Sequence, residues 1–157
     1  MKKILKISIS SASDADIIVF MVLKVFTDGG SKGNPGLSSI GGVGYLDGKQ
    51  IFEFKKSIGI ATNNDAEYKA LIEALINIKN PSFAKATVGK QISKIEFFSD
   101  SRLMVNQVNG LFKVKNGKIK EYILKIRSLE MEINLPVSYS YIPREENTVA
   151  DNLVNSV

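Results

Sequence analysis

Four carboxylates in this chain stand where side chains could do chemistry. Asp28 ends an apolar, strand-like run and opens a glycine-rich turn, and three more acids follow at long intervals: Glu67, Asp100 and Asp151. Mg²⁺ prefers hard oxygen ligands and binds through a few carboxylates, water and substrate phosphate. An acid inside an apolar strand also needs a partner or a metal. If the four side chains converge, the pattern indicates a magnesium-dependent nuclease.

The composition excludes several other kinds of site. The chain has 157 residues, of which 44% are hydrophobic, which suits one globular domain with a filled core. It contains no cysteine and no histidine, so disulfides, thiolate metal sites and the usual zinc ligand and general base are excluded. Any chemistry must therefore depend on carboxylates, metal or lysine.

Positive charge gathers in one part of the chain. The net charge is +5 and the pI is about 9.3. Between residues 109 and 127 one acid, Glu121, stands among six basic residues: Lys113, Lys115, Lys118, Lys120, Lys125 and Arg127. Such a run is explained either by a solvated helix face or by attraction to a polyanionic partner, and the sequence leaves both open.

The first 20 residues carry no motif and are expected to form an extension of unknown role before a domain at residues 21–157. Leu5, Ile7 and Ile9 alternate with polar residues, which would suit an added edge strand, and Met21 is an alternative start. The apolar run at residues 17–23 is far shorter than the roughly 20 residues of a membrane span. We expect a soluble, cytoplasmic monomer without a membrane partner.

The elements that must position the carboxylates follow from hydrophobic periodicity. Strand-like runs occur at residues 22–27, 42–46, 50–54, 94–99 and 136–142, and helical spacing occurs at residues 63–80, 101–108, 119–133 and 148–154. Residues 33–36 are predicted to form a turn, and residues 82–93 and 143–147 to form loops. Three antiparallel strands followed by alternating helices and strands predict an α/β fold with a mixed sheet.

This arrangement predicts where the carboxylates meet. Parallel neighbouring strands place their ends side by side, so Asp28 and Asp100 would lie close together if their strands are adjacent. A helix packed across both strands could deliver Glu67 to the same place. That is the arrangement which two metal ions require.

In this order the motifs resemble those of the type 1 ribonucleases H, specifically the archaeal-like members. The resemblance covers residues 22–154 and rests on blocks at residues 27–36, 61–68, 99–101, 105–110 and 143–151. Each block alone is explained by a turn, a helix cap or a solvated surface residue. Their order and spacing together make the resemblance specific.

The resemblance implies a five-stranded mixed sheet flanked by helices, and hydrolysis of the RNA strand of RNA–DNA hybrids to 5′-phosphate and 3′-hydroxyl ends. It assigns catalysis and metal binding to Asp28, Glu67, Asp100 and Asp151. Two Mg²⁺ ions roughly 4 Å apart would activate a water and stabilise the departing 3′ oxygen, with Asp28 as the bridging ligand. Mn²⁺ is expected to substitute for Mg²⁺.

The same resemblance assigns contacts with the hybrid. Those residues are Gly29, Gly30, Asn34, Thr62, Asn63, Asn64, Lys113, Lys115 and Lys118. The asparagines would contact RNA sugars, because an amide can both donate to and accept from a 2′-hydroxyl, and Thr62 would contact a DNA phosphate. The lysines would supply salt-sensitive attraction to the backbone. For Asn63 and Asn64 the alternative role is to cap a helix.

The chain departs from the family pattern in the loop before Asp151, where Arg144, Glu145 and Glu146 replace a histidine that many members carry. There is no tryptophan for a DNA-backbone contact, and Phe112 is the candidate substitute. Two other functions stay open. One is a non-catalytic nucleic-acid-binding module, and the other is a nuclease of the same fold that cuts double-stranded RNA or DNA.

Overall fold

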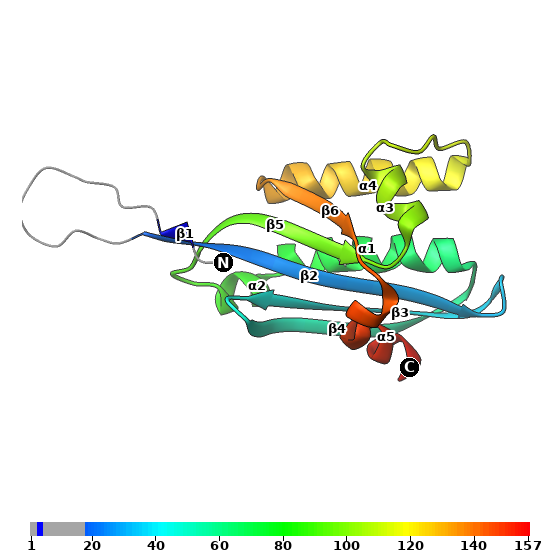
Figure 1. Ribbon diagram of the computed structural model, residues 1–157, viewed down its shortest axis with the longest axis horizontal. Coiled ribbons are helices and arrows are strands. Elements are labelled where there is room, and N and C mark those ends of the chain that lie inside the picture. Colours follow the sequence, from blue (N-terminus) through cyan, green and yellow to red (C-terminus); the bar gives the residue numbers. More distant parts are fainter. Residues whose placement is uncertain (1–2, 5–17) are drawn as a thin grey trace, which may run out of the picture.

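The computed structural model describes residues 3–4 and 18–157 as one sheet with helices on both faces (Figure 1). The strands are β1 (Lys3–Ile4), β2 (Val19–Lys32), β3 (Gly36–Leu46), β4 (Lys49–Ala61), β5 (Gln91–Ser99) and β6 (Val137–Tyr141). The helices are α1 (Asn63–Lys79), α2 (Pro81–Ala86), α3 (Arg102–Val108), α4 (Gly117–Ile133) and α5 (Thr148–Asn155), with a 3-10 turn, η1, at Arg144–Glu146. The alternation at residues 5–9 lies outside the described residues.

The sheet has the strand order β4-β3-β2-β5-β6, and β1 pairs with the start of β2. β2, β3 and β4 are antiparallel, whereas β5 runs parallel to β2 and β6 runs parallel to β5. Asp47 and Gly48 both have positive φ, at 54° and 74°, which is the backbone of a tight hairpin turn between β3 and β4. The predicted five-stranded mixed sheet is confirmed, and β1 adds a sixth strand of two residues.

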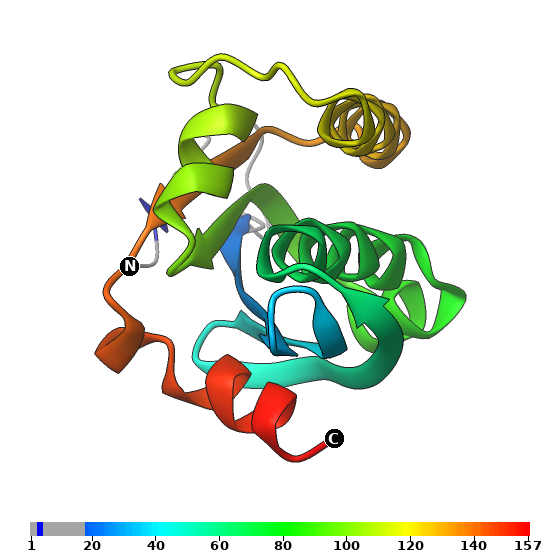
Figure 2. The same cartoon turned by 90° about the vertical axis from the view of Figure 1, so that its right-hand side faces the viewer.

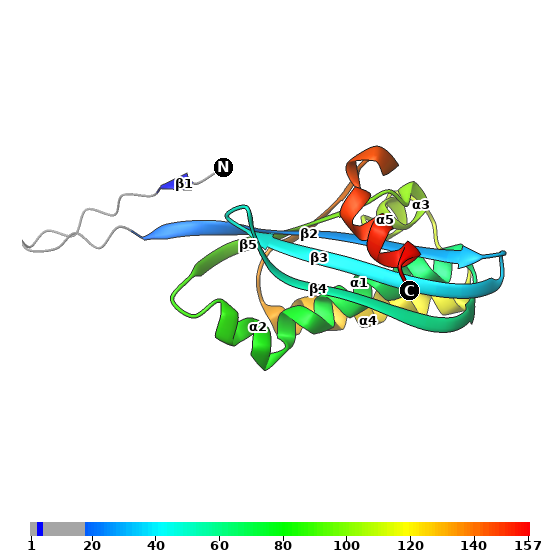
Figure 3. The ribbon, with the colours of Figure 1, turned by 90° about the horizontal axis from the view of Figure 1, so that it is seen from below.

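Helices cover the two faces of the sheet unequally. α1 and α4 lie on one face and α5 lies on the other (Figures 2 and 3). The core lies under α1 and α4, where Leu23 and Val25 of β2 are buried on either side of the exposed Lys24. Leu71 and Leu75 of α1 pack into the same cluster. The alternation along β2 and the helical spacing along α1 therefore meet in one core.

Strands β2, β3 and β4 are longer than the periodicity predicts, and one of them, β3, begins at Gly36 instead of residue 42. β2 continues through Gly29 and Gly30 to Lys32, because these residues stay paired with β3. β4 continues to Ala61 although its last residues carry little alternation. In a sequence pattern, glycine usually indicates a turn. In β2 the two glycines have extended backbone because they are paired with the neighbouring strand β3.

The prediction that residues 82–93 form only a loop was wrong at both ends. α2 begins at Pro81, and Asn80 caps it by accepting a hydrogen bond from the Ser82 backbone N–H at 2.9 Å. Asparagine followed by proline at the first helical position starts a helix here as well as ending the preceding one. β5 begins at Gln91, three residues earlier than predicted.

None of the helices in the described part of the chain is long and apolar enough to span a membrane.

Candidate active site

Asp28 and Asp100 lie at the point where two parallel strands separate. β2 pairs with β5 as far as Thr27 and Ser99, and the pairing ends there. The next residue on each strand is a carboxylate. The strand order therefore places Asp28 beside Asp100.

Glu67 reaches the same place because α1 crosses β2 very closely at Gly29. A Cβ atom built on Gly29 would lie 2.3 Å from the carbonyl carbon of Ala66 and 2.6 Å from the backbone nitrogen of Glu67. Only glycine permits this approach. One carboxylate oxygen from each of Asp28, Glu67 and Asp100 lies within 4.8 Å of the other two.

Asp151 arrives from the opposite face of the sheet. Gly41 is the β3 partner of Asp28, and a Cβ atom built on it would lie 2.8 Å from the Cβ of Leu153 and 3.1 Å from the carbonyl oxygen of Ala150. α5 therefore packs directly on Gly41, which brings Asp151 beside the three clustered carboxylates. All four line one hollow of about 490 Å³.

Two polar side chains hold the segment that leads into α5. The Asn147 amide is buried and donates through Nδ2 to the Thr27 carbonyl oxygen at 2.9 Å, one residue before Asp28. The Arg144 guanidinium donates to Oδ1 of Asp151 at 3.0 Å and lines the same hollow. A cation of the protein therefore lies among the carboxylates.

The carboxylates repel one another and are short of water. Burial, followed by the charges of Asp100 and Asp151, raises the pKa of Asp28 to about 7. Burial, followed by the charges of Asp28 and Asp100, also raises the pKa of Glu67 well above its usual value. Oε2 of Glu67 is buried and has no hydrogen-bond partner among the described residues. A divalent cation would supply that partner and offset the repulsion, so the residues present fit such an ion.

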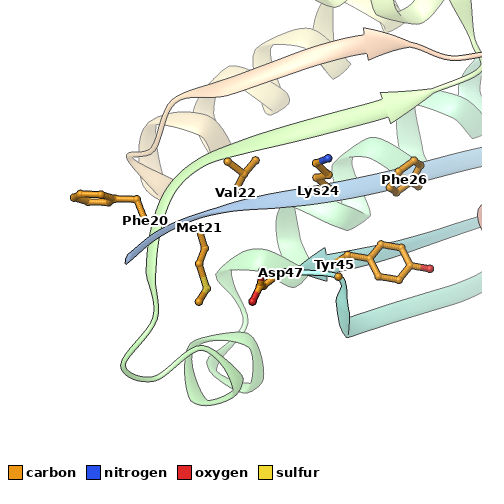
Figure 4. Close-up of a pocket in the computed structure, with 8 residues that line it drawn as sticks. Phe20, Met21, Val22, Lys24, Phe26, Tyr45 and Asp47 are labelled. Carbon is orange, nitrogen blue, oxygen red and sulfur yellow. The ribbon is translucent and has the colours of Figure 1, made fainter. Parts of the chain in front are cut away.

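A second hollow, of about 360 Å³, lies elsewhere on the sheet and has a different lining (Figure 4). Its described lining includes Phe20, Met21, Phe26 and Tyr45, and Asp47 is the one carboxylate among the lining residues that the structure describes. These residues do not supply the clustered acids that phosphate chemistry with metal ions would need. The acidic hollow is therefore the candidate active site.

Two of the three predicted sugar-contacting asparagines, Asn34 and Asn63, meet at the rim of the acidic hollow, which Asn63 lines. Oδ1 of Asn34 accepts a hydrogen bond from the Asn63 backbone N–H at 3.0 Å, and Oδ1 of Asn63 accepts one from the Ser31 backbone N–H at 2.9 Å. Both amide oxygens are thus occupied within the protein. In the described part of the chain neither Nδ2 group makes a hydrogen bond, so both are available as donors to a ligand.

The helix cap at this rim is Thr62, not Asn63 or Asn64. Thr62 Oγ1 accepts a hydrogen bond from the Asp65 backbone N–H at 3.1 Å, and the Asp65 carboxylate accepts one from the Thr62 backbone N–H at 3.3 Å. This is a capping box. Asn63 and Asn64 occupy the first turn of α1, so the capping role that was the alternative for them belongs to Thr62.

The basic segment, residues 109–118, consists of the connection between α3 and α4 and the first two residues of α4. Lys113 and Lys115 are exposed there. Lys118 is exposed too, but it pairs with the buried Asp65, with Nζ 3.2 Å from Oδ1. Burial would raise the pKa of Asp65, but the hydrogen bonds from Thr62 and Lys118 lower it. The three lysines predicted to act alike are therefore in two different environments.

Sequence reasoning missed three residues that position the site: Gly41, Asp65 and Asn147. The spacing of Thr62 and Asp65 is a capping signal that could have identified Asp65. Nothing near Gly41 in the sequence shows that α5 packs on it. Asn147 is polar in a polar loop, and only its burial distinguishes it.

Comparison with known proteins places this geometry in a family. Residues 26–157 match the family described as Reverse transcriptase-like. Ribonuclease HI of Halobacterium salinarum is 34% identical over 131 residues, which are 83% of this chain and 61% of that protein. The structure of LC11-RNase H1 in complex with an RNA/DNA hybrid has a TM-score of 0.77 and 39% identity, and the match covers 86% of this chain and 95% of that one.

A longer relative is the Bifunctional protein Rv2228c of Mycobacterium tuberculosis, which is 34% identical over 137 residues. The match covers 86% of this chain but 35% of that protein, so the chain spans about a third of its length. The solved N-terminal RNase H domain of Rv2228c, fused to maltose binding protein, matches 87% of this chain with a TM-score of 0.74.

Proposed function

The chain belongs to the reverse transcriptase-like family and is related to type 1 ribonucleases H, and from this premise we propose that it hydrolyses the RNA strand of RNA–DNA hybrids. The products would be 5′-phosphate and 3′-hydroxyl ends. One observation carries the proposal: Asp28, Glu67 and Asp100 converge within 4.8 Å, with Asp151 beside them. Buried carboxylates that repel one another need a cationic partner to offset the repulsion and the loss of hydration.

These four carboxylates are the proposed metal ligands. Two Mg²⁺ ions, when bound, would supply an activated water and charge stabilisation at the departing 3′ oxygen, and Mn²⁺ would replace them. Asp28 and Glu67, with their raised pKa values, would have to lose their protons for ligation, so binding would release protons. The chain needs no histidine for this chemistry.

The neighbouring side chains would orient the scissile strand. The free Nδ2 groups of Asn34 and Asn63 would donate to the 2′-oxygens of RNA sugars, which DNA lacks. The Arg144 guanidinium would hold the Asp151 carboxylate in place through its hydrogen bond. Lys113 and Lys115 would attract the backbone without reading sequence.

Choice of substrate rests partly on a relative. LC11-RNase H1 was solved with an RNA/DNA hybrid, and this chain shares 39% of its residues. The asparagine pair argues for ribose in the cleaved strand. Double-stranded RNA also offers ribose, so it must be tested directly.

The test is cleavage of a 5′-labelled DNA duplex that carries one tract of ribonucleotides in one strand. The protein is incubated with Mg²⁺, with Mn²⁺ or with chelator, beside all-DNA and all-RNA duplexes. We expect cuts confined to the ribose tract and lost with chelator or with Asp28→Asn. Binding without cutting would identify a non-catalytic module, and cutting of the all-DNA duplex would refute the assignment of the asparagines.

A further inference from the structure

We propose that Asp65 is a positioning residue that fixes the basic segment at a set distance from the asparagine end of α1, and that this connection selects the hybrid over other duplexes. The inference rests on the proposed function. It concerns which duplex fits the protein rather than how the phosphodiester is cut.

The two oxygens of Asp65 serve two different helices. Oδ2 accepts hydrogen bonds from the backbone N–H and hydroxyl of Thr62, at 3.3 and 2.9 Å. Oδ1 accepts one from the Tyr122 hydroxyl at 3.1 Å and lies 3.2 Å from Lys118 Nζ. One buried carboxylate therefore joins the start of α1 to the first turns of α4.

The basic segment is fastened to α1 at both of its ends. Just before the segment, Gln107 of α3 accepts a hydrogen bond through Oε1 from the Tyr68 hydroxyl at 2.9 Å. Its last residue, Lys118, pairs with Asp65, and Tyr122, one turn further along α4, stacks its ring on the Tyr68 ring with centroids 5.6 Å apart. Tyr68 is fully buried in α1. Lys113 and Lys115 thus lie on a span anchored at each end to the helix that carries Asn63.

This connection matters because it fixes a spacing between two sets of contacts. The asparagine amides would touch sugars of one strand, and the lysines would touch phosphates of the other. The distance between strands across the minor groove differs among duplexes, since A-form RNA has a wide, shallow minor groove and B-form DNA a narrow one. If the basic segment is held rigidly, only a duplex of matching minor-groove width can make both sets of contacts, whereas a loosely held segment can adjust to any duplex.

Lys118 has a different role from the one that its charge suggests. The Lys118 side chain is 56% exposed, but its ammonium group lies 3.2 Å from the buried Asp65 carboxylate, and in this proposal it anchors the segment instead of neutralising a phosphate. It should therefore contribute nothing to counterion release when nucleic acid binds. Lys113 and Lys115 should each contribute a share.

The test uses Tyr122→Phe, Lys118→Gln and the double variant, because all three leave the capping bonds between Thr62 and Asp65 intact. Affinities for a hybrid, an all-RNA duplex and an all-DNA duplex of one sequence are measured by fluorescence anisotropy, in the Asp28→Asn background so that nothing is cut. Matched controls are Lys120→Gln, an exposed lysine on α4, and Tyr45→Phe, a tyrosine on the other face of the sheet. Thermal unfolding establishes that each variant is folded.

We expect the ratio of hybrid affinity to all-RNA affinity to fall about fivefold in the double variant, which removes both the Tyr122 hydrogen bond and the half-exposed Lys118 ion pair to Asp65. Lys118→Arg alone should keep the ratio of the unaltered protein, because it keeps the ion pair. The slope of log affinity against log salt should be unchanged by Lys118→Gln. A merely destabilised helix would not change the preference between duplexes.

Two outcomes would overturn the inference. An unchanged affinity ratio in a folded double variant would show that the connection does not set selection. A salt slope reduced by about 0.9 in Lys118→Gln would show that Lys118 contacts a phosphate directly. If the unaltered protein neither binds nor cuts the hybrid, the proposed function fails as well. Normal cutting with an unchanged ratio overturns the role of Asp65 alone.

Discussion

Replacing Asp28 with asparagine should make the metal-free protein more stable while abolishing its activity. Asp28 is 6% exposed, and its burial, followed by the charges of Asp100 and Asp151, raises its pKa from 3.8 to about 7. In the unfolded chain the same group ionises near 3.8. Folding therefore has to suppress an ionisation that the unfolded chain undergoes, and the asparagine side chain has no such cost.

The size of the effect follows from the shift. A rise from 3.8 to about 7 corresponds to roughly 4 kcal/mol at neutral pH and above, and this is an upper limit because a buried asparagine amide also loses its hydration. We expect about half of it, which raises the melting temperature by roughly 4–8 °C for a chain of this size. Because the folded pKa is raised, the stability of the unaltered protein falls as pH rises from about 4 to 7. The advantage of Asp28→Asn should grow over that window and level off above it.

The assay is thermal unfolding in chelator at pH 5 and pH 8, with Glu121→Gln as an exposed control on α4. Saturating Mg²⁺ should then raise the melting temperature of the unaltered protein and close the gap, because a ligand stabilises the state that binds it. If Asp28→Asn unfolds at the same or a lower temperature at pH 8 without metal, the argument from repulsion is refuted. A gain equal at both pH values would also contradict it.

Three more predictions test how the site is assembled. Gly41→Ala should push α5 away and reduce activity about 10- to 100-fold, with the far-UV circular dichroism spectrum unchanged. Gly117→Ala, whose added methyl meets nothing within 4 Å, should keep full activity. Full activity of Gly41→Ala would show that activity does not depend on the docking of α5. Lys113→Gln and Lys115→Gln should each lower the salt dependence of hybrid binding by about 0.9, and no change would mean that the basic segment points away from nucleic acid. Titration with Mg²⁺ should raise the melting temperature of the unaltered protein but not that of Glu67→Gln, and an equal rise in both would locate the ion elsewhere.

The sequence predicted the parts of the site that depend on strand order. Asp28 and Asp100 each follow an apolar strand, and a mixed sheet with adjacent parallel strands has to bring their ends together. Helical spacing likewise predicted which side of α1 faces the sheet. These features follow from periodicities of two and 3.6 residues, which local sequence records directly.

What the sequence did not show depends on contacts between distant segments. Gly41 matters only because α5, more than 100 residues later, packs on it. In the sequence Lys118 is one lysine in a charged run. Its role differs from that of its neighbours because Asp65, 53 residues earlier in the chain, lies within ion-pair distance of it. The glycines of β2 are extended because β3 pairs with them. No pattern within one segment encodes these pairings.

Because few side chains of α5 are buried, the metal requirement should depend on how firmly this helix is docked. α5 has eight residues and buries only Ala150 and Val154, and the Ser39 hydroxyl adds one hydrogen bond to the Val154 carbonyl oxygen. So small an element detaches at a lower free energy than the domain unfolds. The apparent affinity for an ion that is bound by Asp151 equals the intrinsic affinity multiplied by the fraction of molecules in which α5 is docked. Substitutions under α5, remote from every carboxylate, would thereby set the metal concentration at which half of the molecules are competent.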